Sequence, residues 1–107
     1  REIDQGEWEG RLVNVIKAHY AELWQQRIVD PDSVRPPGGE TVGEVARRVH
    51  AALDDIARLH TPDTVLIVSH GIALATVICK VRGLAVGQAY GVILDHAEPI
   101  WVEWEPI

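Results

Sequence analysis

The chain has 107 residues and a mass of 11.9 kDa, which allows one domain or part of one. Hydrophobic residues make up 47% and charged residues 24%, which excludes disorder as the main state, and no apolar run approaches the ~20 residues that cross a bilayer. A net charge of −6 argues against a broad nucleic-acid surface, but not against a small anionic substrate held in one pocket.

The cysteine and methionine content indicates the cellular compartment of the protein and whether the sequence is a whole translation product. Cys79 is the single cysteine, so no intrachain disulfide can form. This favours a reducing, cytoplasmic compartment, although a bacterial secreted protein can also lack disulfides. The first residues show no basic start followed by an apolar stretch, so no signal peptide is predicted. Because the chain has no methionine and begins Arg1-Glu2, we expect it to be processed, shortened or part of a longer chain.

The first forty residues predict a loop, a helical stretch and a second loop. Residues 1–10 combine two glycines with alternating acids, which favours a turn. From residue 12 to about 27, apolar side chains recur at helical spacing, which predicts one helix, or two short helices broken near His19. Residues 28–40 contain paired prolines and glycines and are too few for a domain linker.

Residues 41–60 carry the clearest helix signal. Thr41 and Glu44 fit a capping box, in which a hydroxyl and a Glu three residues later satisfy each other's backbone N–H groups. A stripe of apolar residues then follows at helical spacing: Val42, Val45, Val49, Leu53 and Ile56. We therefore predict a helix from about 42 to 60.

The rest of the chain predicts strands around a second helix. Residues 64–69 form a short β-branched and aliphatic run, typical of a strand buried on both faces. A glycine turn leads into an apolar helix from 72 to about 82, with Gly83 as its C-cap. Residues 91–94 and 100–104 predict two further strands joined as a hairpin. The order strand, turn, helix indicates an α/β fold.

A candidate anion site lies where the predicted strand ends and the helix begins. His70 stands at the carboxyl end of the strand, where open α/β sheets bind ligands. The N–H groups of a helix N-terminus attract anions, and Gly71 lets the backbone approach a ligand closely. His70 could bind phosphate there or stabilise developing charge. The alternative is a structural histidine bonded to a backbone carbonyl.

Acidic residues crowd the first loop, at Glu2, Asp4, Glu7 and Glu9. A carboxylate that faces an anion site could act as a general acid and protonate a leaving oxygen. The alternative is a solvated acidic loop that Trp8 packs down.

Several other kinds of site are not favoured. The Gly-Gly-Glu-Thr run at 38–41 lacks the lysine of a P-loop, and no Gly-x-Ser-x-Gly or Gly-x-Gly-x-x-Gly motif occurs. The histidines and Cys79 lack metal-ligand spacing, so no metal and no cofactor are expected. We expect Cys79 to be buried and inert, His96 to lie in a loop near His70, and three histidines to lie at the surface: His19, His50 and His60.

Three stretches of the chain resemble the motifs of one family. Residues 2–10 resemble a Glu-x-x-x-Gly-x-Trp-Glu-Gly segment, and residues 37–41 with Arg48 resemble a Pro-x-Gly-Glu-Ser/Thr loop and the arginine that follows it. Residues 65–71 resemble a strand that ends in Ser-His-Gly. Taken in order, with the likeness fading after about Val81, they are similar to the phosphoglycerate-mutase-like histidine phosphatases.

The resemblance implies a fold and a reaction. The family has a three-layer α/β/α sandwich, of which this chain would form about three strands and three to four helices. Its members attack a phosphate monoester with a histidine, then pass the phosphoryl group from phosphohistidine to water or another hydroxyl. By position, Glu2 would be the general acid/base, His70 the second histidine that holds the phosphoryl group, and Gly71 and Ile72 backbone N–H donors to phosphate.

The chain also departs from the family pattern. The nucleophilic histidine of the family lies in an Arg-His-Gly motif, which this sequence lacks. Residues 1–107 are therefore expected to be the C-terminal portion of a single domain, without its central strand and without activity of their own. Unpaired strand edges lead us to expect a homo-oligomer or association with the missing N-terminal segment. Residues 95–99 also differ from the small polar turn usual in the phosphatases.

Two classes of function stay open at this point. One is a phosphomonoester hydrolase whose nucleophile lies upstream of Arg1, with phosphoglycerate mutase as the alternative within enzymes. The other is a non-catalytic module, truncated or degenerate, that binds phosphate or a partner. Retention of both Glu2 and His70 favours the enzyme, acting on a small phosphorylated substrate and with neither nucleic acid nor membrane as a partner.

Overall fold

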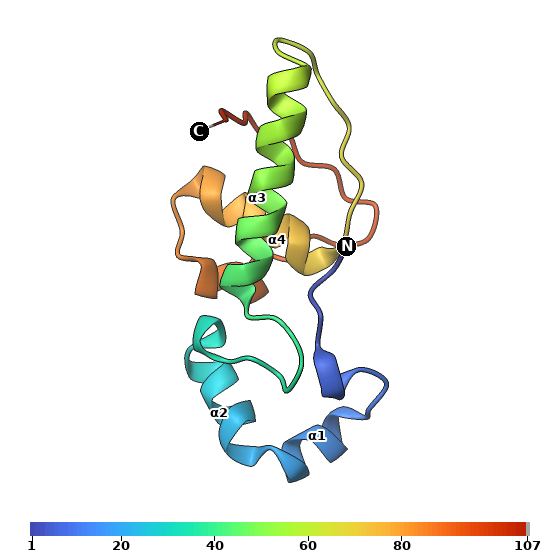
Figure 1. Cartoon of the computed structure of the whole chain (residues 1–107), viewed down its shortest axis with the longest axis vertical. Coiled ribbons are helices and arrows are strands. Elements are labelled where there is room, and N and C mark those ends of the chain that lie inside the picture. The colour runs from blue at the N-terminus through green and yellow to red at the C-terminus, as the bar shows by residue number, and fades with distance from the viewer. Residues whose placement is uncertain (107) are drawn as a thin grey trace.

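A computed structural model describes residues 1–106, so Ile107, the last residue of the predicted domain, lies outside the described residues. The elements in chain order, with η marking a 3-10 helix, are η1 (Gly6–Trp8), α1 (Val13–His19), α2 (Ala21–Val29), η2 (Pro31–Ser33), α3 (Val42–Leu59), α4 (Gly71–Arg82) and η3 (Val86–Gly91). The described chain is elongated, measuring 49 × 25 × 22 Å. Figure 1 shows α3 along the long axis, with α1 and α2 at one end.

The helices predicted in the first half of the chain are confirmed. Of the two alternatives for the stretch at 12–27, the structure has two short helices, α1 and α2, which are separated at Tyr20 by a non-helical φ of −127° and ψ of 45°. Helix α3 begins with the complete capping box. The Glu44 N–H donates to the Thr41 hydroxyl at 3.1 Å, and the Thr41 N–H donates to the Glu44 carboxylate at 3.0 Å.

Helix α4 is the most buried element, because its own side chains are apolar or small on most of its faces. It packs against α3 and η3, and its buried residues include Ile72, Ala73 and Cys79. The predicted C-cap is confirmed, since Gly83 has a left-handed φ of 69° and the Leu84 N–H donates to the Cys79 carbonyl at 2.8 Å. The main core is the cluster formed by Ile3, Val42, Val45, Ile72, Ala73, Ala75, Cys79 and Ala89.

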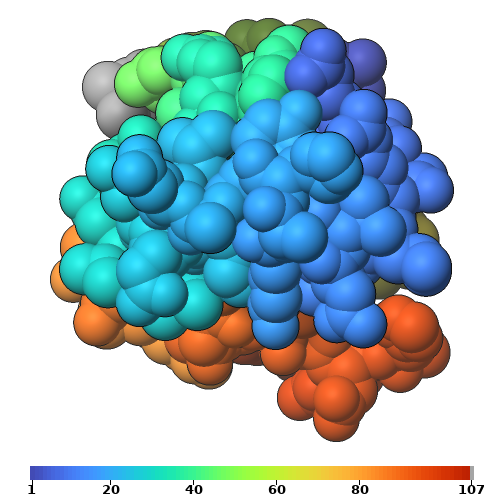
Figure 2. All heavy atoms as spheres, turned by 90° about the horizontal axis from the view of Figure 1, so that it is seen from below, coloured from blue at the N-terminus to red at the C-terminus, as the bar shows by residue number. Residues whose placement is uncertain are grey.

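A second cluster fastens the first loop to the α1–α2 end of the molecule. Trp8, Ile16 and Val34 are buried together, and Trp8 is only 4% exposed, as predicted for a side chain that packs the loop down. In Figure 2 the blue and cyan residues of this end cover most of the face seen from below.

The predicted α/β sandwich is wrong for this structure, since no strand occurs between residues 1 and 106. Residues 64–69, predicted as a strand buried on both faces, form an extended connection from α3 to α4, drawn in yellow in Figure 1. Leu66 and Val68 are 86% and 85% exposed, whereas Val65 and Ile67 are 42% and 37% exposed. One face of this segment is therefore bare. A strand exists only through hydrogen bonds to a neighbouring strand, and no other segment of the described chain supplies them.

The two other predicted strands and their hairpin are also absent from residues 1–106. Gly91 ends η3, and the segment after it has no ladder partner. The segment at 100–104 is held by side-chain contacts instead. The Trp104 indole donates to Asp54 on α3 at 2.9 Å, and its ring lies 5.7 Å from the Lys80 ammonium on α4. No helix in the described range is long and apolar enough to cross a membrane.

Candidate functional site

Two of the three motif stretches lie against each other through backbone contacts. The Glu7 N–H donates to the Pro37 carbonyl at 2.8 Å, and the Glu40 N–H donates to the Asp4 carbonyl at 2.7 Å. The approach is so close that a Cβ on Gly39 would lie 2.5 Å from the Asp4 oxygen. Glycine is therefore required where the two loops meet.

Glu2 joins this pair of loops to the third motif stretch. Its carboxylate accepts the Ile72 N–H at 2.8 Å through Oε2 and the Ala73 N–H at 2.9 Å through Oε1. The Ile3 N–H also donates to Oε1 at 2.8 Å. His70, the N-cap residue, makes no capping bond with its side chain, so Glu2 caps α4 from a distant part of the sequence.

Glu2 and the other acids of the loop have different hydrogen-bond partners. Asp4 accepts the Gly6 N–H at 2.8 Å, Glu9 accepts the Gln5 N–H at 3.2 Å, and Glu7 accepts the Tyr20 hydroxyl at 3.4 Å. These carboxylates stabilise the loop and its contact with α1–α2. Among the four acids, Glu2 is the one bonded to the N-terminus of α4.

Gly71 lies beside the Glu2 carboxylate, and His70 precedes it as the N-cap residue of α4. His70 is exposed, and its side chain makes no capping hydrogen bond to α4. A Cβ on Gly71 would lie 3.8 Å from Glu2 Oε2 and 3.1 Å from Ile93 Cγ2. No acceptor for the Gly71 N–H occurs among residues 1–106. An anion at the N-terminus of α4 would therefore meet the Gly71 N–H near the Glu2 carboxylate, with the exposed His70 one residue before it.

Other predicted residues lie elsewhere or have structural roles. His50 was expected at the surface, but it is half-buried, with its Nε2 3.0 Å from the Thr76 carbonyl and its ring 5.3 Å from that of Trp104. His96 is exposed in a turn. Cys79 is buried as predicted, and burial raises the pKa of its thiol. No three His, Cys, Asp or Glu side chains converge anywhere in the part of the chain that the structure describes.

Arg48 and Glu40, which the sequence placed in one motif, bind each other in the structure. The guanidinium of Arg48 binds Glu40 through two hydrogen bonds of 2.8 and 3.0 Å. Mainly through these bonds, Arg48 lowers the pKa of Glu40, and Glu40 raises the pKa of Arg48. The available signal was the place of Arg48 on α3, three residues after Val45 in the apolar stripe, where a charged residue needs a partner.

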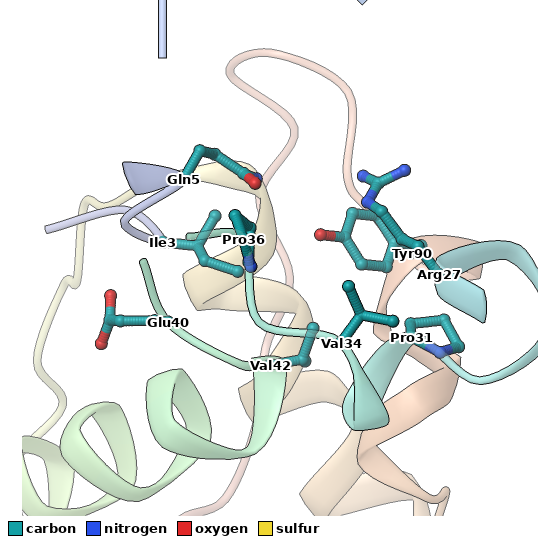
Figure 3. Close-up of a pocket in the computed structure, with 9 residues that line it drawn as sticks. All are labelled: Ile3, Gln5, Arg27, Pro31, Val34, Pro36, Glu40, Val42 and Tyr90. Carbon is teal, nitrogen blue, oxygen red and sulfur yellow. The ribbon is translucent and has the colours of Figure 1, made fainter. Parts of the chain in front are cut away.

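A small cavity beside the first loop is not a substrate site. It measures about 10 Å³, which is room for one water molecule at most. Figure 3 shows Arg27 over the Tyr90 ring on one side of it, and the guanidinium lies 4.4 Å from the ring centre. The Glu40 carboxylate points away from the other lining residues, which agrees with its pairing to Arg48.

The chain is similar to phosphatases and phosphoglycerate mutases of one superfamily. Residues 1–106 match the model of the histidine phosphatase superfamily, branch 1, beyond the point near Val81 where the motif likeness fades. Phosphoserine phosphatase 1 of Hydrogenobacter thermophilus is 30% identical over 96 residues, covering 90% of this chain and 46% of that protein. The probable phosphoglycerate mutase GpmB of Salmonella paratyphi B is 38% identical over 85 residues, covering 78% and 39%.

A solved structure agrees with the backbone arrangement. Bacillus stearothermophilus YhfR superposes with a TM-score of 0.77 at 28% identity, covering 86% of this chain and 46% of that one. The chain thus spans less than half the length of these relatives.

Proposed function

Because the chain belongs to branch 1 of the histidine phosphatase superfamily, we propose that it forms the acid and phosphate-binding part of a phosphomonoester hydrolase. In this proposal residues 1–107 are the C-terminal portion of a single domain. The observation that supports it best is the Glu2 carboxylate at the N-terminus of α4, beside Gly71, the residue that follows His70. A decayed site has no need to keep a carboxylate, an exposed imidazole and a backbone donor together.

In the first step a histidine supplied from outside residues 1–107 would attack phosphorus. The bond from phosphorus to the ester oxygen breaks, and its electron pair stays on that oxygen. Glu2, in its protonated form, would give its proton to the same oxygen, so that a neutral alcohol leaves. His70 and the Gly71 N–H would hold the phosphoryl oxygens as negative charge shifts in the transition state.

In the second step Glu2 would act as a base. Its carboxylate takes a proton from water, the water oxygen bonds to phosphorus, and the bond from phosphorus to the histidine nitrogen breaks. Inorganic phosphate and free histidine result. The Ile72 N–H, which donates to Glu2 Oε2 at 2.8 Å, would be shared between the acid and a phosphoryl oxygen. No step of this sequence requires a metal ion.

A mutase is the second candidate, because relatives at 35–38% identity are named as probable phosphoglycerate mutases. A mutase would pass the phosphoryl group to a hydroxyl of a second site on the substrate rather than to water. The Gly-Glu-Trp-Glu-Gly form of the first motif resembles the phosphatase branches of the family more than the glycolytic mutases, which favours the phosphatase. Incubation with 3-phosphoglycerate separates the two, since a phosphatase releases inorganic phosphate and a mutase makes 2-phosphoglycerate.

The test uses the full-length protein and p-nitrophenyl phosphate with chelator present and no added metal. We expect hydrolysis, and His70→Ala should lower kcat/KM on the order of 10²–10³-fold, as for loss of one charge-stabilising group. His96→Ala is the matched control, with another exposed histidine removed, and should keep its activity. A His70→Ala variant within about twofold of the parent would return His70 to a structural role. Inactive full-length protein would favour the non-catalytic module.

Association is a further part of this proposal, together with a cytoplasmic location. Leu66 and Val68 are exposed on an extended segment, which supports contact with another copy or with chain outside residues 1–107. Residues 1–107 alone should have no phosphatase activity. The check is the mass of the purified segment in solution and its activity with and without a peptide that carries the upstream sequence. A folded monomer with full activity would contradict both statements.

A further inference from the structure

Arg48 is bonded to the backbone on both sides of the Glu2 side chain. Its Nη1 donates to the Arg1 carbonyl at 2.8 Å, and its Nη2 donates to the Glu2 carbonyl at 2.9 Å. The same guanidinium binds Glu40 through Nε at 2.8 Å and Nη2 at 3.0 Å. Its planar fork therefore fixes two carbonyls and a carboxylate in one plane, which the single point charge of a lysine cannot do.

Glu40 extends this hold to the residues after Glu2. Its Oε1 accepts the Asp4 N–H at 2.9 Å, and its own N–H donates to the Asp4 carbonyl at 2.7 Å. The Glu40 side chain is 16% exposed and that of Arg48 30% exposed, so solvent competes little for these bonds. Between the two tied points, Ile3 is buried in the core next to α4.

The direction of the Glu2 side chain follows from these contacts. Its main chain is held by α3 through Arg48, while its carboxylate reaches α4 at Ile72 and Ala73. We propose that Arg48, together with Glu40, is a positioning residue that sets where the Glu2 carboxylate stands relative to His70 and Gly71. This inference rests on the proposed function, in which Glu2 gives a proton to the leaving oxygen.

Leaving-group dependence distinguishes positioning of an acid from general support of the fold. Loss of an acid slows alkyl phosphates more than aryl phosphates, because a phenolate leaves without much help from a proton. Damage to the fold slows both substrates alike. The ratio of kcat/KM on glycerol 2-phosphate to that on p-nitrophenyl phosphate therefore reports on Glu2 itself.

The experiment measures this ratio in full-length protein for Arg48→Lys, Glu2→Gln and the double variant. Arg48→Lys should lower the ratio on the order of tenfold, since small misplacement of a catalytic group costs up to about 10²-fold. Added to Glu2→Gln, the same substitution should change the ratio less than about twofold, because the proton is already lost. Arg47→Lys is the matched control, one residue away at an exposed position, and should leave the ratio unchanged.

Equal losses on both substrates, or independent losses in the double variant, would overturn the inference.

A second readout needs no activity: hydrogen exchange of the Ile72 and Ala73 N–H groups, which donate to Glu2. Arg48→Lys should speed their exchange and Arg47→Lys should not. If the parent protein is inactive but Arg48→Lys still speeds exchange, the proposed function is refuted and the positioning of Glu2 by Arg48 stands. An active parent with unchanged exchange in Arg48→Lys would refute the positioning role alone.

Discussion

Replacement of Gly6 by alanine tests the contact between the first two motif stretches. Gly6 has a left-handed φ of 56°, and a Cβ there would lie 2.2 Å from the Pro37 oxygen and 2.5 Å from the Gly39 nitrogen. Real Cβ atoms do not approach backbone so closely, so the two loops must separate. The hydrogen bond from the Glu7 N–H to Pro37, now 2.8 Å long, would then be lost.

Gly10 supplies the matched control for this prediction. Its φ is also left-handed, at 75°, but a Cβ there would have no atom within 4 Å. Gly10→Ala should therefore cost only the left-handed conformation, about 1–2 kcal/mol of unfolding free energy. Gly6→Ala should add the lost hydrogen bond and its unpaired groups, about 1–3 kcal/mol more.

Urea unfolding followed by tryptophan fluorescence measures the difference, because Trp8 is buried next to the first loop. With a slope of about 1–3 kcal/mol per molar urea, the midpoint of Gly6→Ala should lie roughly 1 M below that of Gly10→Ala. Equal midpoints at equal slopes would refute the reasoning, since they would mean that the loops do not touch at Gly6.

Three further predictions concern single groups. Arg48 lowers the pKa of Glu40 below its ordinary value of 4.5, so the pair stabilises the fold fully above pH 4.5 and less as the pH falls through the lowered pKa. The difference in urea midpoint between wild type and Glu40→Gln should therefore shrink as the pH falls below 4.5. Thr41→Ala removes the acceptor of the Glu44 N–H and should cost about 1 kcal/mol of unfolding free energy in urea. Cys79 is 2% exposed with a raised thiol pKa, so iodoacetamide should modify it only in denaturant, and rapid labelling of native protein would contradict its burial.

The helices could be predicted because their signals are local. A helix bonds its backbone within itself, so a capping box at Thr41, an apolar stripe and a terminal Gly83 suffice to locate α3 and α4. For residues 12–27 the pattern left one helix or two short helices broken near His19 open, and the structure has two helices that meet at Tyr20. Each of these features depends on residues within a few positions of one another.

The strand predictions were wrong because the hydrogen bonds of a strand are not local. Residues 64–69 have the composition of a buried strand, yet composition cannot supply the neighbouring backbone that a strand needs. Without that neighbour the segment stays extended with Leu66 and Val68 exposed. The segment at 100–104 is held through Trp104 instead, by an indole bond to Asp54 that no periodic pattern reveals.

The assignment of Ile72 marks the limit of reasoning about the site. By position, the family resemblance implied that the N–H of Ile72 binds phosphate, which agrees with the general attraction of a helix N-terminus for anions. That rule says that an anion binds, and it does not say which one. In the structure the anion is the carboxylate of Glu2, seventy residues away in sequence, which only the fold brings to α4. The ambiguity has a chemical consequence. Under the proposed function, a phosphate bound at His70 and Gly71 would have the Glu2 carboxylate close by, where protonation of a leaving oxygen requires it.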